Sequence, residues 1–256
     1  MRPSPKAGSK TPQQTVIVDH AIGDVRRFCK EHANAAQVKK YARFFTEGYD
    51  AYGIDKDTWA AHEGMIFERY HDALGLEGIL ALGDKLFESG KYEEGSFAIV
   101  TARPLIDTFD KAAVEHVGEW LETGVRNWAH TDVICGQLIG PCLLRGVVTP
   151  PDIARWTRSP SRWKRRAVPV SLLALLPDKA SIAKMLSWIR PLMTDAERVV
   201  HQGTGWFLRE AWKAEPATVE AFLLEWKDTA PRLIFQYATE KMTPAGKARF
   251  RRAKKG

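Results

Sequence analysis

Apolar side chains recur at intervals of three and four residues along almost the whole chain, in stretches of about 12–18 residues. This spacing places them on one face of a helix. Alternation of apolar and polar residues, which would indicate a strand, never persists, and the sequence contains no Asn-Gly or Asp-Gly hairpin signal. The sequence therefore predicts an all-α fold.

Short segments that contain Gly, Pro, Ser, Thr or Asp separate these helical stretches. They are Gly48–Gly53, Leu74–Glu77, Glu88–Lys91, Thr108–Asp110, Thr149–Pro151, Ser159–Ser161, Pro177–Lys179, Met193–Asp195, Ala214–Pro216 and Thr229–Pro231. Helices joined by such short loops pack as antiparallel hairpins, and pairs that repeat every ~40–47 residues are HEAT-like. We therefore expect a curved α-solenoid of about five or six HEAT-like antiparallel helix pairs, with a concave basic face.

The two ends of the chain differ from the rest. Residues 1–14 are rich in Pro, Ser, Lys and Gly and show no periodicity, so we expect a disordered basic tail. Residues 15–242 are expected to form a single HEAT-like helical repeat domain, and residues 243–256 a basic C-terminal tail. Within the domain, Asp57-Thr58 and Thr194-Asp195 have the composition of helix caps, and Pro216 is expected to open a helix.

The chain has three cysteines without metal-binding spacing, no secretory signal and no apolar run long enough to span a bilayer. We expect a soluble monomer of a bacterial-type cytosol or nucleoid, with no metal and no nucleotide cofactor. The formal net charge of +7 favours an anionic partner.

The basic residues are clustered. The segment Arg145–Arg166 holds seven Arg or Lys and one acid, Asp152, and seven more basic residues without an acid follow from Lys241 onward. Such clusters are typical of proteins that contact phosphate, although a solvated surface or a solubilising tail would look the same. Because Ser159–Arg166 also begins a predicted helix, whose first N–H groups are free, we favour phosphate contact there.

Three short segments combine tryptophan with charge or glycine. In Asn127–Asp132, Trp128 and Asp132 are four residues apart and share one face of a helix. A carboxylate beside a tryptophan needs an explanation on a basic protein, because it repels a phosphate backbone. The other two segments are Arg162–Arg166 and Gly203–Glu210. Glycine inside a helix costs about 1 kcal/mol relative to alanine, so the glycines of the third segment indicate a close approach to the backbone.

In this order, the three segments resemble elements of the AlkD-type DNA alkylation repair family. The family's Asn-Trp-x-x-x-Asp element is similar to Asn127–Asp132, its Trp-x-x-Arg element to Trp163–Arg166, and its Gly-Trp-x-Leu-Arg-Glu element to Gly205–Glu210. An earlier Tyr-led segment, Tyr41–Ile54, and the closing helix Ala230–Ala238 also fit. In the first element, Ala129 and His130 stand where members often carry a second Trp or a further acid.

The resemblance implies a HEAT-like stack and a monofunctional DNA glycosylase, a hydrolase that releases cationic N3- and N7-alkylated purines from double-stranded DNA in base excision repair. It assigns Asp132 as the catalytic carboxylate and places Trp128 and Trp206 on either side of the damaged nucleotide. Arg166 would hold the phosphate beside the lesion. The residues expected to contact DNA are Arg162, Trp163, Lys164, Arg165, Arg209, Tyr41 and Arg43.

Structural roles are an alternative for each of these residues. Trp128 and Trp206 are suited to packing between helices, Asp132 to a surface salt bridge, and Arg166 to pairing with an acid of a neighbouring repeat. His130 points away from the face shared by Trp128 and Asp132, which favours a hydrogen-bonded or exposed histidine.

Two functions of other classes compete with the glycosylase. A non-catalytic DNA-structure-binding HEAT-repeat protein would gain nothing from a carboxylate beside a tryptophan. A protein-binding scaffold would bind with little dependence on salt, whereas phosphate contacts make binding strongly salt-dependent.

Overall fold

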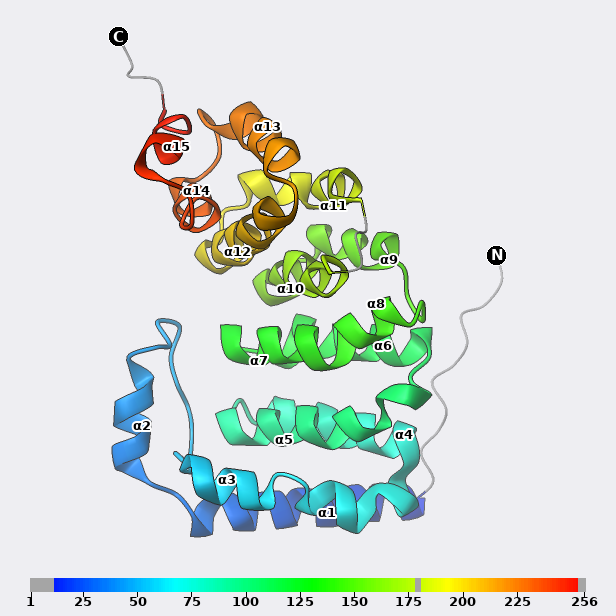
Figure 1. Ribbon diagram of the computed structural model, residues 1–256. Coiled ribbons are helices and arrows are strands. Elements are labelled where there is room, and N and C mark those ends of the chain that lie inside the picture. The colour runs from blue at the N-terminus through cyan, green and yellow to red at the C-terminus, as the bar shows by residue number, and fades with distance from the viewer. Residues whose placement is uncertain (1–11, 178–180, 253–256) are drawn as a thin grey trace. The chain divides into compact units, whose positions relative to one another are not determined.

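The computed structural model describes residues 12–177 and 181–252. These residues form helices and turns and no strand, which confirms the predicted all-α fold (Figure 1). The chain divides into two compact units, Met1–Leu105 and Ile106–Gly256. The domain expected over residues 15–242 is therefore shared between these two units, each of which is described by itself.

Both expected tails are partly folded. Residues 1–11 and 253–256 lie outside the described residues, but the first helix begins at Pro12, so the last three positions assigned to the N-terminal tail are helical. In the segment assigned to the C-terminal tail, Pro244–Ala248 form a helix and Phe250 is buried against Phe235. The first helix thus begins three residues before the expected start of the domain, and Phe250 anchors part of the basic C-terminal segment.

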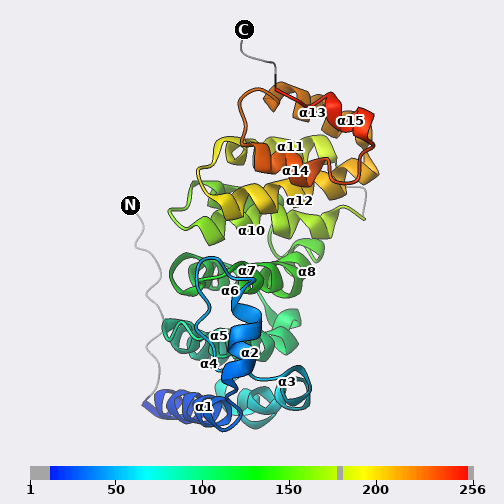
Figure 2. The same cartoon turned by 90° about the vertical axis from the view of Figure 1, so that its left-hand side faces the viewer.

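The first unit contains five α-helices among its described residues. They are α1 (Pro12–Glu31), α2 (Ala35–Ala42), α3 (Lys56–His62), α4 (Met65–Glu88) and α5 (Tyr92–Ala102), followed by the 3-10 turn η1 (Arg103–Thr108). Helix α4 packs against both α1 and α5. Helix α2 buries none of its residues and crosses the stacked helices of this unit (Figure 2).

Two buried acids at the start of α5 hold the segment that follows α2. Glu93 accepts hydrogen bonds from the backbone N–H groups of Tyr52, Gly53 and Ile54 at 2.8, 2.7 and 3.3 Å. Glu94 accepts from the Tyr52 hydroxyl at 2.8 Å. Gly53 has φ +84, and a Cβ there would lie 2.3 Å from a backbone oxygen, so only glycine fits this turn.

The predicted break at Leu74–Glu77 is confirmed, although hydrogen bonding continues through it. Gly75 inside α4 has φ 55 and ψ −171, which is not helical and bends the helix there. Glycine accepts a positive φ without steric penalty, so the bend occurs at this residue.

The second unit contains the remaining helices. They are α6 (Lys111–Glu119), η2 (Trp120–Gly124), α7 (Trp128–Ile134), η3 (Cys135–Ile139), α8 (Gly140–Leu144), α9 (Pro150–Ala154), η4 (Arg155–Arg158), α10 (Arg162–Leu172), η5 (Leu173–Leu175), α11 (Ile182–Ile189), η6 (Arg190–Thr194), α12 (Arg198–Ala214), α13 (Pro216–Trp226), α14 (Arg232–Ala238) and α15 (Pro244–Ala248).

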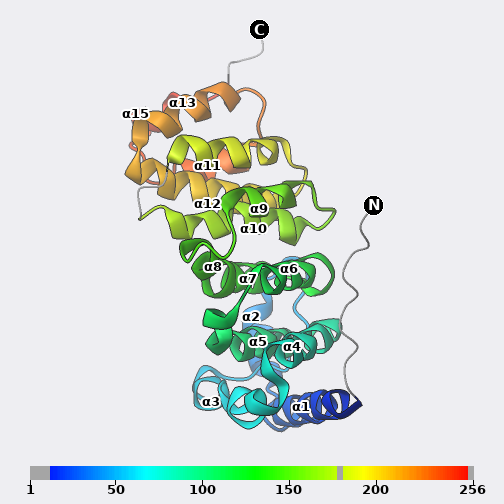
Figure 3. The same cartoon turned by 90° about the vertical axis from the view of Figure 1, so that its right-hand side faces the viewer.

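The longer helices of the second unit form two rows. In the first row, α10 packs against α7 and α12, and α12 packs against α14. In the second row, α11 packs against α9 and α13 (Figure 3). Helix α12 also packs against α13, which joins the rows. This pairing is compatible with the predicted solenoid.

Local sequence signals account for several helix starts. Pro216 opens α13 as predicted, and the helix predicted after Thr194-Asp195 begins at Arg198. The cap predicted at Asp57-Thr58 lies two residues earlier, where the Asp55 side chain accepts from the N–H groups of Asp57 and Thr58 at 3.1 and 3.0 Å.

The glycines predicted to mark a close approach in α12 do so. A Cβ at Gly205 would lie 2.5 Å from the Tyr237 Cβ and 2.8 Å from the Ile234 backbone oxygen, both on α14. A Cβ at Gly203 would lie 3.1 Å from the Arg166 Cγ. Helix α12 is thus in close contact with α10 and α14 through these two positions.

Replacing Gly205 with alanine is expected to destabilise the protein. Relief of the glycine penalty would stabilise the helix by about 1 kcal/mol, but the new methyl group must displace α14, and such overpacking costs about 1–3 kcal/mol. We expect a net loss of roughly 1 kcal/mol in the free energy of unfolding, measured by chemical denaturation. The control is Gly23→Ala in α1, where nothing lies within 4 Å of the new Cβ. The crowding argument fails if both variants are more stable than the wild type.

Candidate functional site

An ion pair between a buried arginine and a partly exposed aspartate joins two of the three sequence segments singled out above. Arg166 of α10 donates from Nε and Nη2 to the two carboxylate oxygens of Asp132 on α7, at 2.9 and 2.8 Å. Its remaining nitrogen, Nη1, donates to the backbone oxygen of Val199 on α12 at 2.6 Å. One guanidinium therefore connects three consecutive helices of the first row.

The backbone of α12 makes room for this arginine. Gly203 lies one turn after Val199, and its missing side chain leaves space for the Arg166 Cγ and Nη1, which would be 3.1 and 3.5 Å from a Cβ. Helices α7, α10 and α12 follow one another in the row, coloured green to dark yellow in Figure 1. Arg166, which holds the Asp132 carboxylate, is thus itself fixed by its contacts with α12.

Burial and charge act in opposite directions on the Asp132 carboxyl. Removal from water raises its pKa above the ordinary value, while the hydrogen bonds and the positive charge of Arg166 lower it. The Asp132 side chain keeps 17% of its surface exposed, whereas that of Arg166 keeps only 6%. The carboxylate is therefore the member of the pair that a bound molecule can reach.

Trp128 stands at the first position of α7, one turn before Asp132. The Asn127 side chain caps this helix by accepting from the His130 N–H at 2.8 Å, and its amide lies 3.0 Å from the His130 ring nitrogen Nδ1. Both capping residues are buried, while Trp128 is 36% exposed. The cap therefore fixes the start of the helix so that an indole and a carboxylate lie on one face. His130 is buried and hydrogen-bonded, as its position off that face indicates.

Trp206 lies in α12, three residues after Gly203. Residues three apart lie on the same side of a helix, so Trp206 is on the side of α12 that faces Arg166. Its side chain is half-buried. The structure thus brings Trp128, Asp132, Arg166 and Trp206 onto three neighbouring helices.

The basic segment before Arg166 is largely ion-paired within the protein. The Lys164 ammonium is buried and contacts Glu119 and Glu122 at 3.2 and 2.6 Å. Arg165 donates to both oxygens of Asp195 at 2.6 and 3.2 Å. These acids are 30 to 45 residues away in the sequence. The composition of the segment itself therefore gave no sign that its cations are paired.

The residues at the start of this segment, Ser161 and Arg162, are more exposed than Lys164 and Arg166. Arg162 makes a looser contact with Glu197 at 3.4 Å and lies over the ring of the buried Trp163. The Ser161 side chain caps α10 by accepting from the N–H groups of Trp163 and Lys164 at 3.2 and 3.4 Å. The free N–H groups expected to bind phosphate are thus partly occupied by this serine.

The other residues expected to contact DNA lie outside this basic segment. Arg209 of α12 pairs with Glu210 and Glu240 at 2.8 and 2.5 Å. Tyr41 and Arg43 belong to the first unit, at the end of α2, where Tyr41 is half-buried and Arg43 is exposed.

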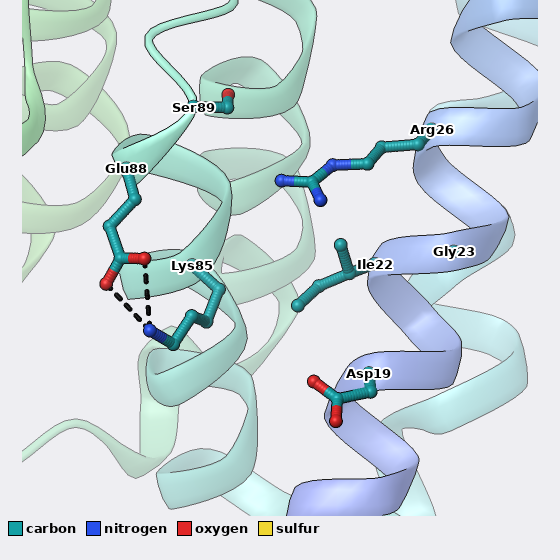
Figure 4. Close-up of a pocket in the computed structure, with 7 residues that line it drawn as sticks. All are labelled: Asp19, Ile22, Gly23, Arg26, Lys85, Glu88 and Ser89. Atoms are coloured by element: carbon teal, nitrogen blue, oxygen red, sulfur yellow. Dashed lines mark hydrogen bonds and ion pairs between the residues drawn. The ribbon is translucent and has the colours of Figure 1, made fainter.

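A mixed-charge pocket lies in the first unit between α1 and α4. It is lined by Asp19, Ile22, Gly23, Arg26, Lys85, Glu88 and Ser89 (Figure 4). Lys85 and Glu88 pair with each other across 2.9 Å, and Arg26 pairs with Glu94. Both cations of this pocket are thus ion-paired, and its lining includes no aromatic residue.

A metal centre and a membrane-spanning helix are both absent from the residues that the structure describes. Residues 12–177 and 181–252 contain no group of three or more His, Cys, Asp or Glu side chains placed to hold a metal ion. Within the same ranges, no helix combines the length and apolar character that crossing a membrane requires. The three cysteines are buried and unpaired with one another.

Comparison with known proteins gives one consistent result. Residues 25–242 match the sequence pattern of a family described as DNA alkylation repair enzyme. A solved structure described as a predicted DNA alkylation repair enzyme from Enterococcus faecalis superposes with a TM-score of 0.71 at 17% identity, over 83% of this chain and 98% of that one. At this identity the likeness concerns the fold. No curated protein sequence matches the chain.

Proposed function

Because the chain belongs to the DNA alkylation repair enzyme family, we propose that it is a monofunctional DNA glycosylase acting on cationic N3- and N7-alkylated purines in duplex DNA. The observation that supports this proposal most is the Asp132 carboxylate, held by two hydrogen bonds from Arg166 one turn from the exposed Trp128.

The proposed reaction needs a fixed negative charge more than a general acid. An alkylated purine such as N7-methylguanine is already cationic, so when the C1′–N bond breaks, its electron pair leaves with the purine, which departs neutral. The sugar acquires oxocarbenium character, which a preorganised carboxylate stabilises. Water then adds to C1′ and loses a proton to the solvent. Asp132 would also orient this water.

The tryptophans have a matching role. Indole faces attract cations, and this attraction grows as the sugar becomes positive. Trp128 and Trp206 belong to helices on either side of α10, so we propose that they flank the damaged nucleotide and contact its deoxyribose.

Arg166 has a different role in this proposal from the one that the resemblance implies. Three of its nitrogen atoms donate to groups of the protein, and the residue is buried. We therefore propose that Arg166 positions Asp132 instead of holding the phosphate beside the lesion. Arg162 and Arg209 remain candidates for DNA contact in the second unit, and Tyr41 and Arg43 in the first.

The proposed setting follows from the reaction. Release of the base leaves an abasic site, which is the first step of base excision repair. The reaction needs neither a metal ion nor a nucleotide cofactor, and we propose that a monomer carries it out on the DNA of a bacterial-type cytosol or nucleoid.

One observation favours a non-catalytic DNA-binding protein instead. Both carboxylate oxygens of Asp132 already accept from Arg166, as in a purely structural ion pair. In such a protein, the pair would only hold α7 to α10.

Release of N7-methylguanine from methylated duplex DNA distinguishes the two functions. A glycosylase is expected to release the free base and leave a strand that breaks only after heating in alkali. Base release is quantified by chromatography, and DNA occupancy is measured in parallel. Binding without release of either N3- or N7-alkylated purines would establish the non-catalytic function.

A further inference from the structure

Three arginines of the second unit differ from the ion-paired cations around Arg166. Arg126, Arg158 and Arg198 are exposed and form no ion pair with any residue in the described ranges. Arg126 comes two residues before Trp128, and Arg198 immediately precedes Val199, whose backbone oxygen binds Arg166. Unpaired positive charge therefore lies close to the candidate site although the cations within the site are neutralised.

Two of these arginines belong to a regular series. Arg126, Arg162 and Arg198 recur at intervals of 36 residues. Arg126 directly precedes the cap of α7, while Arg162 and Arg198 are the first residues of α10 and α12. The series therefore places one arginine at the beginning of each of three consecutive helices in the first row.

The beginnings of these helices lie together. Val125, Arg162 and Glu197 line one open depression of about 440 Å³. Val125 and Glu197 are the chain neighbours of Arg126 and Arg198. Among residues 12–177 and 181–252, the series forms one ion pair, the 3.4 Å contact of Arg162 with Glu197, in which both side chains are 40% exposed. Arg126 and Arg198 are thus exposed directly beside residues that line this depression, and Arg162 lines it with a partly exposed side chain.

We propose that Arg126, Arg162 and Arg198 form a phosphate-binding row for one strand of duplex DNA, beside the site at Asp132. This inference rests on the proposed function only for the choice of DNA as the partner. Guanidinium groups match the geometry of phosphate oxygens and keep their charge at any physiological pH. The row supplies the phosphate contacts that Lys164, Arg165 and Arg166 cannot, because acids of the protein neutralise those three.

The spacing of packed helices predicts the register on the strand. Neighbouring helices lie about 8–10 Å apart, and successive nucleotides of a strand rise by about 3.4 Å. Arginines on consecutive helices would then contact phosphates roughly two to three nucleotides apart.

The first test is the salt dependence of binding to a short unmodified duplex. This duplex contains no alkylated base, so no base is released while binding is measured. The full chain is compared with Arg126→Ala, Arg198→Ala and the double variant. Each substitution is expected to lower the slope of log affinity against log salt by about 0.9, and the double variant by about twice as much. The matched control is Lys184→Ala, an exposed lysine on α11 in the second row, which should keep the wild-type slope. Wild-type slopes in both single arginine variants would overturn the row.

Neutral methylphosphonates placed one at a time along the strand test the register. The wild type is expected to lose affinity at positions two to three nucleotides apart, and each variant should become insensitive at one of them. Unchanged sensitivity at every position in both variants would reject the proposal. Both experiments measure binding alone. A smaller salt slope in the arginine variants would therefore support the phosphate-binding row even if the wild type released no base.

Discussion

Asp132→Asn is expected to lower the rate of base release by about 10³-fold at equal DNA occupancy, an effect of the size seen when one preorganised group that stabilises a transition-state charge is removed from an enzyme. Asparagine has nearly the shape of aspartate and can still accept one hydrogen bond from Arg166, but it has no negative charge to stabilise the sugar. The measurement is single-turnover release of N7-methylguanine with the DNA saturated by protein.

Asp195→Asn is the matched control for this variant. Asp195 forms the same kind of two-oxygen contact with Arg165, the neighbour of Arg166 on α10. The two side chains of this pair are about as buried as those of the Arg166–Asp132 pair. Both substitutions should therefore lower the stability of α10 by similar amounts. We expect only the Asp132 variant to lose base release. Equal losses of rate in the two variants would show that Asp132 has a structural role alone.

The sequence predicted the fold well because helical periodicity and breaks are local signals. The spacing of apolar residues depends on which side of a helix faces the core, and a glycine such as Gly75 can take up a positive φ that bends the chain without help from distant residues. Gly203 and Gly205 also indicated that a neighbouring helix approaches their backbone closely, because glycine inside a helix is unfavourable unless a neighbour needs the space. Which neighbours approach, α10 and α14, depends on packing and was not predictable.

The charges around the candidate site were harder to predict, because their partners come from other helices. Lys164 and Arg165 stand in a segment with almost no acid, which favoured phosphate contact. Their partners come from other elements: Glu122 lies in η2, and Asp195 directly follows η6. A solenoid brings residues about one repeat apart into contact, so a basic segment can be neutral in the folded protein. The regular series that begins at Arg126 required the helix boundaries before it could be recognised.

Exchanging Arg166 for methionine is expected to lower base release at neutral pH by about 10²-fold, the cost of a small misplacement of a catalytic group. It should also change the pH dependence in a definite direction. Burial raises the pKa of Asp132 and Arg166 lowers it, so without the arginine only the raising effect remains. Catalysis needs the ionised carboxylate, and the acidic limb of the rate profile should therefore move to higher pH than in the wild type.

The free energy of unfolding of this variant should also depend on pH, because the pKa of Asp132 differs between the folded and unfolded states. A carboxyl whose pKa is higher in the folded than in the unfolded state favours folding when protonated, and this contribution is lost as pH rises from about 4 through the folded pKa. The stability deficit of Arg166→Met should therefore increase as pH rises from the folded pKa of Asp132 in the wild type to its higher folded pKa in the variant. Arg165→Met, which breaks the neighbouring pair with Asp195, should keep the wild-type acidic limb. If the limb of Arg166→Met also stays in place while its rate falls, Arg166 acts on a group other than Asp132, because only the removal of its charge from that carboxyl moves the limb.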